Sequence, residues 1–369
     1  MRNFSAIIFL LNTLCLSQSS FAQAGESGFD PTIKMKGLIH SRLEVSLTDS
    51  VDVQNKFSAE PISSNFRIRR LELRSDIKLT NKFSGVIRIQ LPALKTTSTN
   101  TGNVIELGYL EYKVRNEFQI RFGQFKIPYE LDELTSHEDL RMVDRGTTSV
   151  LMVNNFQASY QPGLMLFGNL LKDKTPLNYY LAVVNGGNRA LAYDDNAQKN
   201  LIGRLEFFPV KGFRIGAGGQ IVALTDATGN SYGVDLQVIQ NVSTKTKLIV
   251  EGEYIQAINL ADYAADTTAL KDIADFNLSG YFGQVLFKID IDKSWCKTFE
   301  AGGKYENTDP RTAVDANSFS TITGNIGFTF LPDNTARLQF NIVHTSWDTP
   351  ISGTIDAGNM FVTQFQLKI

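Results

Sequence analysis

Hydrophobic and polar residues alternate along most of this chain from residue 31 onward, in segments of about 9–16 residues bounded by turn or loop signals. Such alternation places apolar and polar side chains on opposite faces of a β-strand. We expect sixteen strands, over residues 32–48, 66–79, 82–91, 104–114, 117–126, 155–171, 177–185, 200–207, 212–225, 231–241, 244–258, 276–290, 297–306, 318–330, 335–347 and 356–369. Helical spacing is hard to find except around Leu131 to Leu140.

The links between these segments alternate between short and long. The short ones are 80–81, 115–116, 172–176, 208–211, 242–243, 291–296 and 331–334. The long ones are 49–65, 92–103, 127–154, 186–199, 226–230, 259–275, 307–317 and 348–355, with 226–230 the weakest example. Long loops at one end and tight turns at the other are typical of outer-membrane barrels, whereas a soluble sandwich has no reason for this asymmetry. The pattern predicts an all-β, single-chain transmembrane antiparallel barrel, whose even strand number leaves no unpaired edge.

Alternation alone does not say which face points outward. In segment 212–225, for example, Ile215 and Ile221 share one face while Arg214 and Gln220 share the other. We expect the apolar faces to contact lipid because the chain has an export signal, strands of even length and asymmetric loops. The facing of segment 104–114, which alternates poorly, stays open.

The first 22 residues have the pattern of a signal peptide. Arg2 precedes the apolar run Ala6-Ile-Ile-Phe-Leu-Leu11, and small residues lie where cleavage after Ala22 would occur. We expect residues 1–22 to be removed and residues 23–369 to form one barrel domain. A single cysteine, Cys296, then remains, too few for a disulfide. No apolar run is long enough for a transmembrane helix.

The amino-acid composition limits the classes of function that this chain can have. The formal net charge is −2, without the basic excess that nucleic-acid binding requires. The 25 phenylalanines and 12 tyrosines suit lipid-facing strands and interfacial girdles. The expected partners are therefore outer-membrane lipid and small solutes, with no nucleic acid.

The long link 127–154 is polar yet contains regularly spaced leucine, methionine and valine residues, so we expect it to fold into the barrel and narrow the bore. Its acids are Glu130, Asp132, Glu133, Glu138 and Asp139, and its bases, including the residue just before it, are Lys126, Arg141 and Arg145. These charges would set the selectivity of a constriction. Alternatively, they only solvate the loop or hold it to the wall.

Basic residues slightly outnumber acids on the faces assigned to the lumen, and rings of Arg or Lys favour anions. The candidates for anion selectivity on the wall are Arg70, Arg74, Arg88, Arg121, Arg204 and Arg214. Strict alternation predicts that Arg67 and Arg69 point away from the lumen. The alternative is that wall charges pair across strands and leave a weak field.

The sequence gives little support for an enzyme. The three histidines lie in no metal-binding spacing, and no GxSxG motif or phosphate-binding glycine loop occurs. A lipase built on a barrel would need a serine–histidine pair on the lipid face, and no motif marks one. We therefore expect no catalytic residue, no metal and no cofactor.

Several motifs resemble the phosphate-selective porin O and P family. They are Phe66-Arg-Ile-Arg-Arg-Leu-Glu-Leu73, Tyr109-Leu-Glu-Tyr112, Arg121-Phe-Gly-Gln-Phe-Lys-Ile-Pro-Tyr129, Glu133-Leu-Thr-Ser136 and Asp144-Arg145. The resemblance implies a sixteen-stranded outer-membrane channel, commonly trimeric, whose third extracellular loop folds inward. It also implies that basic residues along the pore select anions, with Arg121, Lys126, Arg141 and Arg145 at matching positions.

The expected function is passive diffusion of small hydrophilic solutes, anionic or neutral, through the outer membrane of a Gram-negative bacterium. Phosphate or a related ion fits this expectation. One alternative is a sealed barrel with a structural or binding role. An exported enzyme is a further alternative, while an energised receptor would need a plug domain and more strands than this length allows.

Overall fold

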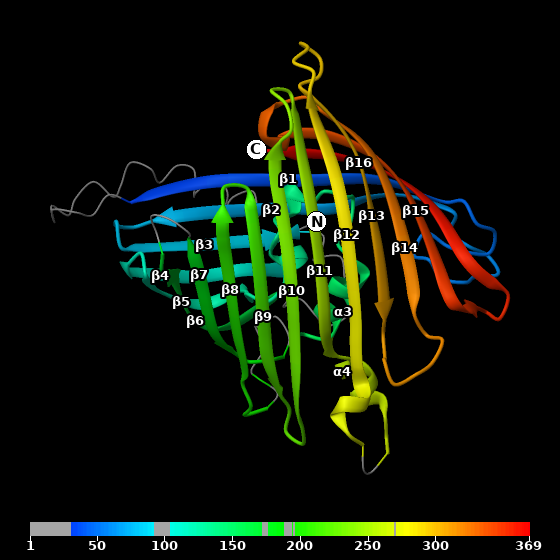
Figure 1. Cartoon of the computed structure of the whole chain (residues 1–369), viewed down its shortest axis with the longest axis horizontal. Helices are drawn as coiled ribbons and strands as arrows, with labels where there is room; N and C mark the ends of the chain where they lie inside the picture. The colour runs from blue at the N-terminus through cyan, green and yellow to red at the C-terminus, as the bar shows by residue number, and fades with distance from the viewer. Residues whose placement is uncertain (1–30, 92–103, 172–175, 188–193, 195, 269–270) are drawn as a thin grey trace, which may run out of the picture.

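Sixteen antiparallel strands form one closed barrel in the computed structural model, which describes residues 31–91, 104–171, 176–187, 194, 196–268 and 271–369 (Figure 1). The signal peptide 1–22 and the links 92–103 and most of 172–176 lie outside the described residues. Each strand pairs with its neighbours in sequence, and β1 closes on β16 from Leu38↔Lys368 to Ser46↔Met360. The predicted fold class and strand number are confirmed.

The strands lie close to their predicted positions. They are β1 Thr32–Ser46, β2 Ser64–Lys78, β3 Phe83–Gln90, β4 Ile105–Arg115, β5 Phe118–Lys126, β6 Tyr160–Asn169, β7 Leu177–Val184, β8 Asn200–Val210, β9 Phe213–Ala223, β10 Thr228–Asn241, β11 Thr246–Ile258, β12 Asn277–Asp290, β13 Thr298–Asp309, β14 Phe319–Thr329, β15 Ala336–Ile351 and β16 Ile355–Lys368. In the described part of the chain, none of the helices has the length and apolar character needed to cross a membrane.

Long loops gather at one end of the barrel and tight turns at the other, as predicted. We call these the long-loop end and the short-turn end. Two links at the long-loop end are nevertheless tight. β10 begins at Thr228, directly after β9, and β15 and β16 extend past the expected limit until Ile351 pairs with Ile355. The expected long link 348–355 is therefore wrong.

The two faces of the wall differ in the way that alternation predicted. On β15, Arg337, Gln339 and Asn341 are buried inside the barrel while Ile342 is 58% exposed on the outside. The same holds on β9 for buried Gln220 and exposed Ile221. Apolar side chains thus form the outer surface that would contact lipid, and most polar ones face inward.

Two β-bulges overturn the strict alternation of side chains. On β2, His40 pairs with Arg70 but the next residue of β1, Ser41, pairs with Ile68, so Arg69 is the extra residue. Arg67 and Arg69 therefore point inward, contrary to the prediction. A bulge turns one extra side chain to the same face and shifts the parity of every residue beyond it.

The second bulge lies on β4, where Ile89 of β3 pairs with Ile105 and Arg88 pairs with Leu107, leaving Glu106 as the extra residue. Leu107, Tyr109 and Glu111 then share the inward face, and Leu110 is exposed outside. This decides the open question of facing in this strand, and its inward apolar residues explain the poor alternation.

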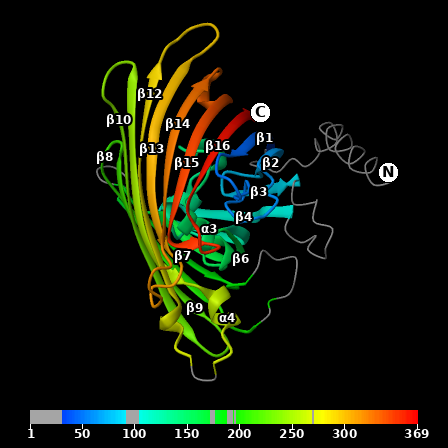
Figure 2. The same cartoon turned by 90° about the vertical axis from the view of Figure 1, so that its right-hand side faces the viewer.

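The link between β5 and β6 folds into the barrel, as predicted (Figure 2). It contains α2 (Leu131–Leu134), the 3₁₀ turn η4 (His137–Asp139) and α3 (Thr147–Asn154). We call residues 127–159 the inward loop, because β6 begins at Tyr160 and not at residue 155 as expected. Phe156 and Ser159, with φ of 58° and 81°, form the turn that enters β6. Elsewhere in the described residues, short helices are α4 (Leu260–Ala265), η5 (Ile273–Phe276) and η6 (Pro332–Asn334).

Candidate functional site

The candidate site is the constriction that the inward loop makes with the barrel wall. Directly after β5, Pro128 cannot continue the strand ladder, and Tyr129 carries the chain into the interior, to the wall at β8 and β11. There the Tyr129 carbonyl accepts a hydrogen bond of 2.8 Å from Arg204 Nη1 on β8, and the Tyr129 hydroxyl donates to the carbonyl of Gln256 on β11. The loop therefore spans the bore.

The start of α2 is held by a carboxylate of the wall. Glu253 on β11 accepts hydrogen bonds from the backbone N–H groups of Leu131 (2.6 Å) and Asp132 (3.2 Å). Farther along, Arg141 forms an ion pair of 2.8 Å with Glu251, also on β11. Arg337 on β15 donates to the carbonyl of Leu140 at 2.8 Å. Charged wall residues thus fix the loop backbone on two sides of the barrel.

An apolar cluster fills the space between the loop and one part of the wall. Its members from the loop and its entry are Phe125, Ile127, Tyr129, Met152 and Ala158, and its wall members are Met165, Ala182, Val184, Ile202, Ile255, Ala257 and Leu278. All are nearly inaccessible to solvent. Leu131, Leu140, Met142 and Val143, the spaced apolar residues of the loop, are buried as well, as predicted. The wall members of the cluster are an exception to the expectation that apolar strand residues face lipid.

Several loop charges pair within the loop or with Lys126 at its entry. Arg145 Nε lies 2.8 Å from Glu133 Oε2, and Lys126 Nζ lies 3.6 Å from the other oxygen of Glu133. Arg145 also donates to the Asp132 carbonyl, while an Asp132 carboxylate oxygen accepts from the backbone N–H of Gly146 at 2.5 Å. These groups hold the shape of the loop.

Glu130 is buried in the loop and accepts a hydrogen bond of 2.6 Å from the Ser149 hydroxyl of α3. Burial raises the pKa of Glu130 to about 8, and the neighbouring carboxylate of Asp132 contributes to this shift. Glu138 and Asp139 lie on the short-turn side, where the Asp139 carboxylate accepts from Asn334. Glu130, Asp132 and Glu133 are therefore buried, whereas Glu138 and Asp139 lie nearer the short-turn end of the barrel.

A compact cluster joins the loop to β2, β3 and β4. His137 Nδ1 lies 2.5 Å from Glu72, and Arg88 lies 3.0 Å from Glu106 and 3.6 Å from Glu72. The donor atoms of His137, Glu72 and Glu106 are close enough to surround a metal ion. Arg88 already supplies positive charge at that point, so the cluster is better described as an ion-pair network.

The other wall arginines named from the sequence also have partners. Arg204 and Arg214 share Glu206 and Asp235 at 2.7–3.3 Å. Arg74 lies 2.6 Å from Asp76. Arg121 lies 2.5 Å from Glu111, and its guanidinium carbon is 4.4 Å from the centre of the Tyr109 ring. Arg70 is buried opposite His40. Cross-strand pairing, the alternative reading of these residues, accounts for most of them.

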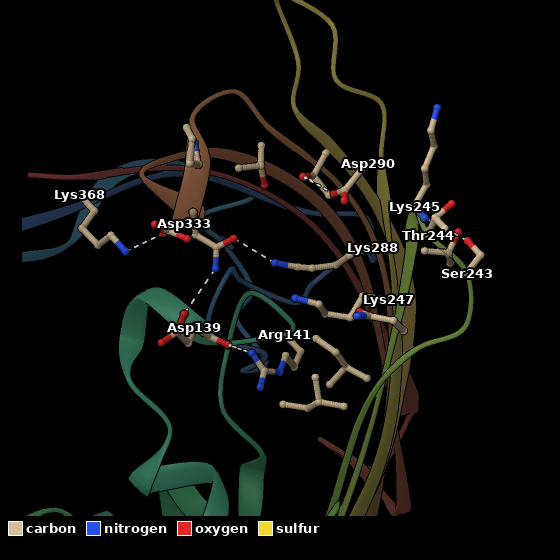
Figure 3. Close-up of a pocket in the computed structure, with 18 residues that line it drawn as sticks. Asp139, Arg141, Ser243, Thr244, Lys245, Lys247, Lys288, Asp290, Asp333 and Lys368 are labelled. Atoms are coloured by element: carbon tan, nitrogen blue, oxygen red, sulfur yellow. Dashed lines mark hydrogen bonds between the residues drawn. The ribbon is translucent and has the colours of Figure 1, made fainter. Parts of the chain in front are cut away.

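A cavity of about 610 Å³ lies beyond the loop at the short-turn end (Figure 3). Its charged lining comprises Arg141, Lys245, Lys247, Lys288, Lys368, Asp139, Asp290 and Asp333. Lys288 donates to Asn334 Oδ1 at 2.9 Å, and Lys368 donates to the Asp333 carbonyl at 2.6 Å. Alternation assigned all four lysines to the lumen, but they were not among the selectivity candidates.

Lys247 and Lys288 are direct cross-strand neighbours on β11 and β12, and both point into the cavity (Figure 3). Lys288 Nζ lies 3.5 Å from a carboxylate oxygen of Glu300, whereas Lys247 has no carboxylate within 4 Å among the described residues. Like charges placed directly opposite each other in a sheet are destabilising. The arrangement provides two adjacent cationic groups in a water-accessible space, which is the chemistry that attracts an anion.

Comparison with known proteins agrees with this architecture. The model of the phosphate-selective porin O and P family matches residues 47–368. Among curated proteins none matches the sequence.

The barrel resembles solved outer-membrane proteins at low sequence identity. The outer-membrane channel DcaP of Acinetobacter baumannii has 13% identity and a TM-score of 0.57, with 94% of this chain and 99% of that chain covered. The anion-selective porin from Comamonas acidovorans has 9% identity and a TM-score of 0.58, with 92% and 100% covered. OprB of Pseudomonas putida has 9% identity and a TM-score of 0.59, with 91% and 94% covered.

Proposed function

Because this chain belongs to the phosphate-selective porin O and P family, we propose that it is an outer-membrane channel through which small hydrophilic solutes, mainly anions, diffuse passively. The family and the closed barrel make it an outer-membrane channel protein. The preference for anions, phosphate or related ions among them, is the proposed part.

The observation that carries the anion preference is the pair Lys247–Lys288 at the cavity of the short-turn end, which in outer-membrane barrels is the periplasmic end. An anion between the two ammonium groups would relieve their repulsion, and several weak sites of this kind let an ion enter and leave. Arg141 of the inward loop also lines the cavity, where it is paired with Glu251.

We assign selection by size to the inward loop. Its backbone is fixed by Glu253, Arg204 and Arg337, so it narrows the bore without a bound cofactor. The wall arginines Arg74, Arg88, Arg121, Arg204 and Arg214 contribute mainly by holding carboxylates in pairs. Neutral solutes small enough to pass the loop would also diffuse through.

The proposal includes maturation and assembly. Residues 1–22 would be cleaved as a signal peptide, and residues 23–369 would insert as a barrel that associates into a homotrimer. Mass spectrometry of the purified protein would identify the first residue of the mature chain. Crosslinking in detergent would reveal the number of copies.

The central experiment is the reversal potential across a planar bilayer in a potassium chloride gradient. The native channel is expected to favour chloride, and Lys247→Gln is expected to reduce that preference severalfold. Lys293→Gln is the matched control, because Lys293 is exposed in a turn at the same end but does not line the cavity.

A cation preference of the native channel would overturn the anion assignment, as would equal effects of the two lysine substitutions. A sealed barrel, the alternative, would give no conductance steps at all, so the same recording distinguishes the two functions.

A further inference from the structure

A row of three hydrogen-bonded side chains lies on the outer surface of the barrel near the long-loop end. His344 and Ser346 are two residues apart on β15 and so share one face, and Asn359 on β16 lies directly opposite His344. Ser346 Oγ lies 3.0 Å from His344 Nε2, and His344 Nδ1 lies 2.9 Å from Asn359 Oδ1. All three are partly exposed.

The hydrogen bonds of Asn359 determine which ring nitrogen of His344 carries the proton. Thr48 Oγ1 accepts from the Asn359 backbone N–H at 2.8 Å and from its side-chain Nδ2 at 3.4 Å. The Asn359 amide oxygen therefore faces His344 and can only accept, so the proton of the neutral imidazole resides on Nδ1. His344 Nε2 is left with a lone pair that accepts the proton of the Ser346 hydroxyl. This is the arrangement that activates a serine nucleophile.

The three side chains lie along the barrel wall at the level where the ester groups of membrane lipids are found. On the lipid-facing side of β15 the apolar residues end at Ile342, and His344 and Ser346 are the next two outward residues. With a rise of about 3.4 Å per residue, His344 lies about 7 Å beyond Ile342. Lipid acyl esters are found at this boundary between the hydrocarbon core and the headgroups. Ile322 on β14, opposite His344, is 53% exposed and offers a surface for an acyl chain.

We propose that Ser346, His344 and Asn359 form a serine-esterase site on the lipid-facing wall that cleaves acyl esters of membrane lipids. This activity is separate from diffusion through the bore, because the three side chains lie on the opposite face of the wall from the lumen. The run His344-Thr345-Ser346 is no known hydrolase motif, so sequence reasoning missed it. Only the pairing of β15 with β16 brings Asn359 to the histidine.

The reaction needs no reagent other than water. Ser346 Oγ attacks the ester carbonyl while its proton passes to His344 Nε2, and the tetrahedral intermediate expels the lysolipid alcohol, which takes that proton. The acyl group remains on Ser346 as an ester. Water, deprotonated by His344, then attacks this ester and releases the fatty acid, and the Ser346 hydroxyl is restored. Asn359 and Thr48 are positioning residues.

The outer wall supplies no dedicated donors for the oxyanion, because strand backbone N–H groups are used by the ladder. Interfacial water would solvate the negative charge instead. Loss of one preorganised donor slows comparable enzymes by about 10²–10³-fold. We therefore expect slow turnover, which makes covalent labelling of the serine the most sensitive measurement.

The test uses the full barrel, purified in detergent, and a fluorophosphonate probe followed by mass spectrometry of the labelled peptide. The native protein is expected to be labelled at Ser346, and Ser346→Ala and His344→Ala are expected to lose labelling. Ser320→Ala is the matched control, because Ser320 lies opposite Ser346 on the same outer face but its hydroxyl contacts Tyr305 and Asn307, so the substitution should leave labelling unchanged. Unaltered single-channel conductance would show that each variant is folded.

Fatty-acid release from vesicles identifies the substrate. Vesicles of a diacyl phospholipid and vesicles containing an acylated outer-leaflet glycolipid are compared with vesicles of a diether phospholipid, which has no ester. Release from either ester-containing vesicle and none from the diether vesicle is expected. Asn359→Ala should lower kcat at least tenfold at unchanged KM, and Asn359→Asp should restore it. Absence of labelling in the native barrel, or labelling that persists in Ser346→Ala, would overturn the proposal and leave these residues as an interfacial hydrogen-bonded row.

Discussion

Asp144 of the inward loop and Arg42 of β1 form a two-pronged ion pair, with Nη1 to Oδ2 at 2.8 Å and Nη2 to Oδ1 at 3.0 Å. The same guanidinium donates to the carbonyl of Val143 at 2.5 Å. Arg69, the bulged residue of β2, lies 3.8 Å from the carboxylate. Burial alone would raise the pKa of Asp144, but the charges of Arg42 and Arg69 outweigh it and hold that pKa well below its usual range. One acid thus attaches the middle of the loop to the first two strands.

We predict that Asp144→Ala loosens this part of the loop. Arg42 is buried and would lose a charged partner, and a hydrogen bond to a charged group contributes about 1.5–3 kcal/mol. The barrel should unfold at a lower temperature, and single-channel conductance should rise and become noisier. Asp348→Ala, an exposed acid on β15, should leave both unchanged. Equal conductance in all three proteins would mean that the ion pair does not hold the loop.

A second prediction concerns the glycine that α3 packs against. A Cβ atom at Gly280 on β12 would collide with Thr148 of α3 and lie 2.8 Å from the Asn307 carbonyl. Gly280→Ala should displace α3, lower stability by about 1–3 kcal/mol as overpacking does, and change conductance. Gly283→Ala on the same strand meets no atom within 4 Å and should behave like the native protein. Thermal unfolding with bilayer recording measures both, and indistinguishable variants would refute the packing argument.

The strands and the direction of their faces could be predicted from the sequence because both follow from period-two alternation and from loop length. The inward loop could be predicted because apolar residues such as Leu131 and Met142 in a long polar link must pack against something. The wall residues that contact the loop could not be predicted. They come from strands far apart in sequence, as with Glu253 on β11 and Arg337 on β15.

The errors in the site come from local irregularity. A bulge at Arg69 and another at Glu106 each turn an additional charged side chain inward, and a rule of strict alternation has no means to place them. Selectivity candidates were also chosen by charge and inward parity, whereas pairing depends on register. Arg204 and Asp235, for example, belong to strands that are not neighbours.

We further predict that Arg121→Ala shifts the channel toward cations. Arg121 neutralises Glu111 and lies among aromatic rings, with its guanidinium carbon 5.0 Å from the centre of the Phe167 ring. Removing it leaves an uncompensated carboxylate on the lumen wall. The reversal potential should move toward the cation side, and the double variant Arg121→Ala/Glu111→Ala should return to the native value. A shift that persists in the double variant would assign the effect to altered packing of the rings.

The last prediction concerns pH and Glu130. Its folded pKa of about 8 lies above the ordinary value of 4.5, so the fold favours the protonated form. This contribution to stability is fully present below about pH 4.5, declines as the pH rises and is lost above about pH 8. Glu130→Gln stays neutral and keeps the hydrogen bond from Ser149, so the melting temperature of the variant should exceed that of the native barrel by an amount that grows from pH 5 to pH 9. Glu138→Gln on the same loop should follow the native curve. Parallel curves for Glu130→Gln and the native protein would contradict the assignment of a protonated, buried Glu130.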